Sequence, residues 1–273
     1  MSSDSGWPGA LPETLPEPQP LPGAIVPPEN PLAENPPWTL WDVLRIAAVT
    51  LAMILIFVLI AMIVAQKLLY PKLSFMEVAK FPLVSVFAQL GAYLVVLIFM
   101  YTIATRSGMS FNKAISWNWP KHFGYYLLAG VGFSISLQAL AHLLPMPKSL
   151  PIDRFFQTPA EAWVLSIFGM TLAPLLEEFF FRGFLYPVLA RRVGVVIAVL
   201  LTSVGFSLIH VPQLGQAWGP VLIVFLIGLA LTIIRAKTKS VSAGLLTHMA
   251  YNAWISILVF VVSGGFRHLD RIK

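Results

Sequence analysis

Long apolar runs, separated by short segments that carry most of the charge, dominate the chain after residue 45. A helix of about 20 residues crosses the hydrocarbon core of a bilayer, so each uncharged run of about that length predicts a membrane span. Such runs cover residues 46–65, 81–103, 123–144, 162–176 and about 241–262. The fourth is the shortest, and it runs directly into Glu177 and Glu178.

One further apolar stretch, residues 193–234, is too long for a single helix. Pro212 and Pro220, with two glycines between them, favour a loop in its middle and divide it into two spans. His210 lies at this break.

The predicted fold is an all-α, polytopic transmembrane helix bundle of seven spans. An eighth span results if the residues around Glu177 form a separate helix after Pro174. The composition agrees, because 58% of the residues are hydrophobic and 11% are charged, whereas a soluble domain has roughly a quarter of its residues charged. The chain has no cysteine, which excludes disulfides, thiolate metal sites and a cysteine nucleophile.

Charge is distributed unevenly along the chain. Residues 1–44 contain acids but no Lys or Arg, and residues 1–37 are so rich in proline that we expect a disordered or polyproline-like tail. The later bases lie in short loops between apolar runs, where they indicate contact with the lipid bilayer and not with nucleic acid. The Lys and Arg residues are divided too evenly between the two sides of the membrane to indicate which side each end of the chain faces. Aromatic residues near the span ends fit an interfacial belt, namely Trp38, Trp41, Tyr70, Trp117 and Trp119.

Glu177, Glu178 and Arg182 are the first candidates for chemistry, because ionisable groups at membrane depth are costly and are commonly functional. On a helix Glu178 and Arg182 are four residues apart and can pair. Glu177 lies one step, about 100°, around the helix and can present its carboxylate elsewhere. The structural alternative is that the helix ends here and the charges face water.

Two other apolar segments contribute the remaining polar groups. His210 follows Phe206 by four residues, and His248 and Asn252 share one face of the last span. Taken alone, each has a structural alternative: an interfacial histidine in the first case, and a hydrogen bond between helices in the second.

Together these residues are of the kinds that hydrolysis needs. A glutamate can take a proton from water, and a histidine can share that work or protonate a leaving amine. A second histidine and an asparagine amide can donate to a developing oxyanion. If a divalent metal such as zinc is bound, Glu177, His210 and His248 are its candidate ligands, although no His-Glu-x-x-His motif is present.

The three motifs resemble those of the CPBP (Abi) intramembrane protease family, which includes the type II CAAX prenyl endopeptidases and bacteriocin-processing or immunity relatives. The motifs are Glu177-Glu178-x-x-x-Arg182, Phe206-x-x-x-His210 and His248-x-x-x-Asn252. The resemblance covers about residues 160–262. It implies a peptidase in which Glu177 activates water with help from His210.

By the same resemblance, His248 and Asn252 would stabilise the oxyanion, and Glu178 and Arg182 would support the geometry of the site. No cofactor is the favoured expectation, with a divalent metal as the alternative. The expected substrate is a peptide or protein, either lipidated or embedded in the membrane. The predicted organisation is a tail at 1–37, N-terminal spans at 38–159, a catalytic domain at 160–262 and a basic C-terminal tail at 263–273.

Two other functions stay open at this stage. A scaffold or immunity factor of the same fold would keep its function without Glu177. A proton-coupled transporter would use Glu177, His210 and His248 as a relay, but the sequence has no convincing internal repeat of the kind many transporters show.

Overall fold

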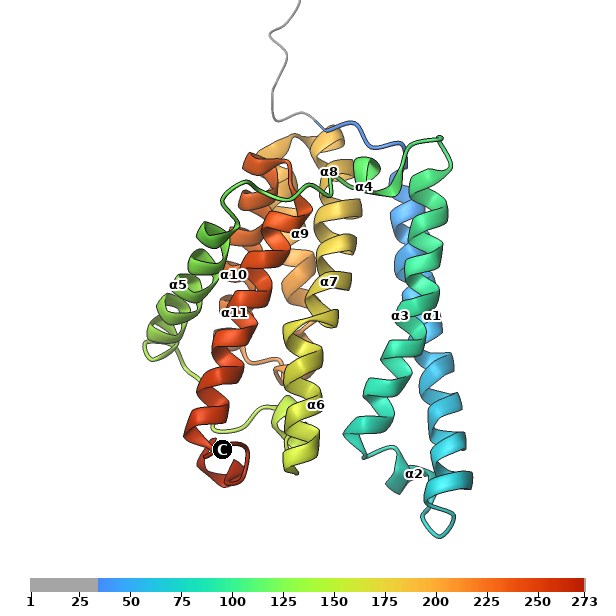
Figure 1. The fold of residues 1–273 in the computed structure, drawn as a ribbon, viewed down its shortest axis with the longest axis vertical. Helices are drawn as coiled ribbons and strands as arrows, with labels where there is room; N and C mark the ends of the chain where they lie inside the picture. Colours follow the sequence, from blue (N-terminus) through green and yellow to red (C-terminus); the bar gives the residue numbers. More distant parts are fainter. Residues whose placement is uncertain (1–33, 273) are drawn as a thin grey trace, which may run out of the picture. The chain divides into compact units, whose positions relative to one another are not determined.

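The computed structural model describes residues 34–272 and is built from helices, with no strand among those residues (Figure 1). The predicted all-α class is therefore confirmed. The described residues contain seven helical segments long and apolar enough to cross a membrane, which places the protein in the membrane as a multi-pass protein. Most of the expected tail, residues 1–33, lies outside the described part of the chain.

The spans follow the apolar runs closely. The first is α1 (Leu40–Val64), which a π-helical turn extends to Leu69, and the next two are α3 (Pro82–Thr105) and α5 (Phe123–Ala141). The fourth is a composite of α6 (Pro159–Met170), α7 (Leu172–Glu178), the π-helical segment η3 (Phe179–Leu185) and α8 (Tyr186–Val193). The last three are α9 (Val195–Leu208), α10 (Trp218–Thr238) and α11 (Val241–Val262).

Local chemistry sets several of the helix ends. Thr39 caps α1 in a capping box with Asp42, and Thr158 caps α6 in the same way with Glu161. Gly194, at a φ of 81°, is the single residue between α8 and α9. A positive φ suits glycine because it has no Cβ, so the chain can reverse direction there within one residue.

The fourth span differs from its predicted end at Leu176, because it continues through the charged residues to Val193. Glu178 and Arg182 are fully buried and paired with one another, so they do not mark the point where the helix reaches water. The separate eighth span is therefore absent from the described residues. Instead the helix is interrupted twice, by a break at Thr171 before Pro174 and by η3.

The helices pack as an α1–α3 pair and a group formed by α5 to α11, with α5 lying along α11 (Figure 1). At Gly130 the two backbones are so close that an added Cβ would lie 2.3 Å from the Thr247 carbonyl oxygen. Such contact between backbones is available only to the smallest side chains. It fixes the position of α11 one residue before His248.

Two expectations about the N-terminal region need correction. Trp38 is fully buried and stacks on Phe184, so it is a core residue and not part of an interfacial belt. Trp41, by contrast, is 69% exposed, as an interfacial residue can be. The end of the expected tail also differs, because Glu34 and Pro36 make defined polar contacts with helices α8 and α10.

Candidate functional site

The break in the fourth span places Glu177 at the C-terminal end of α7. Pro174 has no N–H to donate to the previous turn, and its ring disfavours a continuous helix there. The helix accordingly breaks at Thr171 and restarts as α7. Glu177 and Glu178 follow within the same short helix and diverge, as their spacing predicts, with Glu177 partly exposed and Glu178 fully buried.

Glu177 lies between the two predicted histidines. Its Oε1 is 3.9 Å from His210 Nε2, and its Oε2 is 3.7 Å from His248 Nε2. Both distances are longer than a direct hydrogen bond and leave the three side chains facing one another across a small space. Three helical segments that are far apart in sequence therefore converge on one carboxylate.

In each imidazole, the hydrogen bond made by Nδ1 determines whether the Nε2 that faces Glu177 carries a hydrogen. His210 Nδ1 is 2.8 Å from the Phe206 carbonyl oxygen, which can only accept, so His210 Nδ1 carries the hydrogen. His248 Nδ1 lies 3.0 Å from Glu178 Oε1 and donates to that carboxylate in the same way. In each neutral ring Nε2 is then a free acceptor directed at Glu177.

A buried ion network supports His248 from behind. Arg182 Nη1 donates to Glu178 Oε1 at 2.8 Å, and both side chains have no exposed area. Arg182 also donates to the Thr232 hydroxyl and to the Gly228 carbonyl of α10. The pair predicted from the i,i+4 spacing is thus present, and it links α10 to the ring of His248.

Asn252 lies one turn beyond His248 on α11 and faces the same cavity. Its Nδ2 donates to the Gly169 carbonyl of α6 at 2.7 Å, next to the break at Thr171. The amide has two N–H groups, so this bond fixes the side chain and leaves the other N–H for a further acceptor.

The site opens into a cavity of about 420 Å³. Its walls contain all four predicted catalytic side chains together with apolar residues of α6, α10 and α11. One wall was not predicted from the sequence: Ser85, Gln89 and Tyr93 of α3 line the cavity. Their spacing of four residues places polar groups on one face of an apolar helix, which is the signal that would have found them.

The described residues provide no ready ligand set for a metal. Within them, no three histidine or acidic side chains converge as metal ligands would. Zinc would need its ligand atoms about 2 Å from the metal and therefore roughly 3.3 Å from one another. The Glu177 carboxylate oxygens lie 3.9 Å from His210 Nε2 and 3.7 Å from His248 Nε2. We therefore assign no step to a metal, and the cofactor expectation stays a prediction.

Comparison with known families places this arrangement in context. Residues 159–254 match the family model described as type II CAAX prenyl endopeptidase Rce1-like. This confirms the resemblance predicted from the three motifs, all of which lie within the matched residues. No curated protein and no solved structure matches the chain. The match supports a peptidase that acts within the membrane.

Proposed function

We propose, from the premise that residues 159–254 match a family of type II CAAX prenyl endopeptidases, that this protein hydrolyses peptide bonds with a glutamate-activated water. The observation that carries the proposal is Glu177, held in a cavity between His210 Nε2 and His248 Nε2. A water molecule between these groups can donate one hydrogen to the Glu177 carboxylate and the other to an imidazole Nε2. Its lone pair is then free to attack a carbonyl carbon.

Glu177 acts as the general base in this mechanism. As the water oxygen bonds to the peptide carbonyl carbon, one water proton passes to the carboxylate and the carbonyl oxygen takes up the negative charge. The tetrahedral intermediate then breaks at its C–N bond, and the proton is delivered to the leaving amine by Glu177 or through His210. The products are a carboxylic acid and an amine, and Glu177 is again a carboxylate. The acid then gives its remaining proton to the amine or to water and leaves as a carboxylate.

The negative oxygen of the intermediate needs hydrogen-bond donors. Asn252 can supply its second amide N–H, because the first is held by Gly169. His248 donates from Nε2 when its ring carries both hydrogens, with Nδ1–H held by Glu178. Glu178 and Arg182 act through His248: they fix the ring and its tautomer and do not touch the substrate.

The proposed substrate is a peptide or protein segment that reaches the cavity from the membrane or its surface. Among the described residues lining the cavity, the ionisable side chains are Glu177, His210, His248, Tyr93 and Tyr251, with no lysine or arginine. The rest of the wall is apolar or carries neutral polar groups. An uncharged segment fits these walls better than a charged one, because burying a charge is costly. A lipid chain attached to the peptide could pack against the same apolar residues.

The test is peptide hydrolysis by purified protein in detergent or liposomes, with a peptide library that includes prenylated CAAX peptides. Glu177→Gln keeps the shape of the side chain but removes its basicity, so we expect kcat to fall by about 10²- to 10⁴-fold. His142→Ala is the matched control, since His142 caps α5 and has no part in the site. Cleavage that Glu177→Gln leaves unchanged would refute the mechanism.

A chelator arm separates the metal alternative. Activity retained after dialysis against a chelator supports the glutamate mechanism, whereas activity lost with the chelator and restored by zinc assigns Glu177, His210 and His248 to a metal. If no peptide is cleaved under any condition, the scaffold function gains support, and Glu177→Gln in cells then tests it directly.

A further inference from the structure

The π-helical segment η3 lies directly after the two glutamates and contains Arg182. Its wide register is visible at its end, where the Tyr186 N–H donates to the Phe181 carbonyl, five residues earlier. The next residue is Pro187, which has no N–H. In the same five-residue register, an N–H at position 187 would donate to the Arg182 carbonyl. Because Pro187 has none, the Arg182 carbonyl needs a hydrogen-bond donor from elsewhere in the protein.

Arg235 of α10 supplies that donor. Its Nε donates to the Arg182 carbonyl oxygen at 3.2 Å, and the residue is only 1% exposed. A buried guanidinium needs a partner, because an uncompensated charge is strongly destabilising. Glu34 is that partner: Arg235 Nη1 donates to its Oε1 at 2.7 Å, and Nη2 donates to its Oε2 at 3.3 Å.

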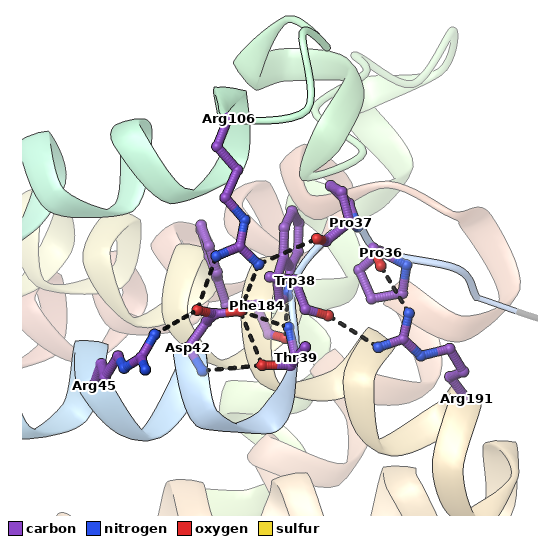
Figure 2. Close-up of polar contacts among 9 residues, drawn as sticks. All are labelled: Pro36, Pro37, Trp38, Thr39, Asp42, Arg45, Arg106, Phe184 and Arg191. Carbon is purple, nitrogen blue, oxygen red and sulfur yellow. Dashed lines mark hydrogen bonds and ion pairs between the residues drawn. The ribbon is translucent and has the colours of Figure 1, made fainter.

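Trp38 supplies a second donor from the same stretch of chain. Its indole Nε1 donates to the Phe184 carbonyl of η3 at 3.0 Å, and its ring stacks on Phe184 with centroids 4.4 Å apart. Figure 2 shows Trp38 beside Phe184, with Arg191 of α8 reaching the carbonyls of Pro36 and Trp38. The stretch before α1 is therefore bonded to both η3 and α8.

A further ion pair ties the stretch to α3. Asp42, only 4% exposed in its side chain, accepts two hydrogen bonds from Arg106, at 3.0 and 2.6 Å (Figure 2). The hydrogen bonds to Asp42 raise the pKa of Arg106. We call residues 34–42 the strap. It connects the ends of α3, α8 and α10. It bonds the Phe184 carbonyl of η3 directly through Trp38, and it reaches the Arg182 carbonyl through Arg235, which Glu34 holds.

We propose that Glu34 and Trp38 of the strap are positioning residues of the peptidase site, which hold η3 in its π register and thereby keep Arg182 against Glu178. The inference rests on the proposed function. The path is short: Glu34 holds Arg235, Arg235 holds the Arg182 backbone, and the Arg182 side chain holds Glu178. Glu178 in turn fixes the His248 ring that faces Glu177.

The strap has no part in the chemistry itself, because neither Glu34 nor Trp38 lines the cavity. It lies outside the residues that match the endopeptidase family, 159–254. A structural role alone would change stability only. A positioning role must also change the order of η3 and the rate of the chemical step.

Two conservative variants test the proposal in the full-length protein. Trp38→Phe keeps an aromatic ring against Phe184 but removes the indole N–H, and Glu34→Gln removes the charge that compensates Arg235. The matched controls are Trp41→Phe, which alters the 69%-exposed ring of the strap, and Arg45→Gln, which removes an exposed cation of α1 just after it. Size-exclusion profiles and thermal melting in detergent identify any variant that fails to fold.

The first readout is amide hydrogen exchange, which needs no substrate. We expect the amides of residues 179–186 to exchange about tenfold faster in Trp38→Phe and Glu34→Gln, the change that follows the loss of one hydrogen bond to a buried group. Amides in α5 serve as the internal reference. Exchange in 179–186 that equals that of the controls would overturn the proposal.

The second readout is cleavage of a peptide that the wild type hydrolyses. We expect kcat to fall by about tenfold or more with KM within about twofold, because small displacements of catalytic groups are costly in rate. Faster exchange with unchanged kcat would make the strap merely structural and would also overturn the proposal. A wild type that cleaves nothing counts against the proposed function, and hydrogen exchange then decides alone whether the strap holds η3.

Discussion

The α1–α3 pair and the group formed by α5 to α11 occupy the same membrane but are held together differently. In the pair, the buried surface between the two helices is apolar along most of its length, and the buried acid Asp42 lies at the end, where it meets Arg106. In the group, Glu178, Arg182 and Arg235 are buried among the helices themselves. Apolar packing therefore holds the α1–α3 pair together. The stability of the α5 to α11 group depends in addition on each buried charge keeping its oppositely charged partner.

The largest expected effect is on the buried pair. Arg182→Met removes the only guanidinium bonded to Glu178 in the described residues and leaves that carboxylate buried without its cation. We expect a loss of about 3–5 kcal/mol in the free energy of unfolding. Thermal or denaturant unfolding in detergent measures it.

Arg45→Met gives the matched comparison for this prediction. Arg45 pairs with Asp42, but its side chain is 68% exposed, and exposed pairs contribute about 0–1 kcal/mol. Equal losses in the two variants would contradict the distinction between the two regions.

The second prediction compares two glycines. In Gly130→Ala the new methyl meets the Thr247 backbone oxygen at 2.3 Å, and backbone cannot move aside cheaply. In Gly91→Ala, within the α1–α3 pair, the obstacle is the Phe57 ring, which can rotate toward lipid. We expect Gly130→Ala to destabilise by about 1–3 kcal/mol and Gly91→Ala by less, measured as shifts in melting temperature. The reverse order would show that α5 is not tightly docked on α11.

A third prediction concerns activity at Gly244 of α11. A methyl there would lie 2.7 Å from Glu178 Oε2, so Gly244→Ala must displace the carboxylate that orients His248. We expect kcat to fall by about tenfold or more, with a smaller change in melting temperature than Arg182→Met gives. Ala243→Ser, at the neighbouring buried position, controls for a small addition to the same helix.

The smallest expected effect is on substrate binding, at the cavity wall that α3 forms. Gln89→Leu removes a polar group without changing the proposed catalytic residues. We therefore expect KM to rise by severalfold, the consequence of losing one hydrogen bond to substrate. Kinetics with a cleaved peptide measure this, and Phe87→Leu, on the exposed face of α3, is the control. An unchanged KM would mean that substrate does not touch α3.

The sequence predicted the spans because apolar length is dictated by the bilayer, and it predicted the divergence of Glu177 from Glu178 because a helix rotates about 100° per residue. It misplaced the end of the fourth span, because the uncharged run stops at Leu176 and the sequence does not show that Glu178 and Arg182 are buried together. The contact of Trp38 with η3 could not be predicted, because it joins residues 146 positions apart. The hydrogen bond from Asn252 to the Gly169 carbonyl could not be predicted either, because it depends on the helix break at Thr171.

The single residue between α8 and α9 has a consequence for biosynthesis. With only Gly194 as a joint, the fourth and fifth spans can enter the bilayer only as a helical hairpin, in which Glu177 and His210 already face one another. His248 arrives with α11, which leaves the ribosome after both of these spans. The nascent protein therefore carries Glu177 and His210 together before α11 docks, and the proposed catalytic site is completed only by that docking.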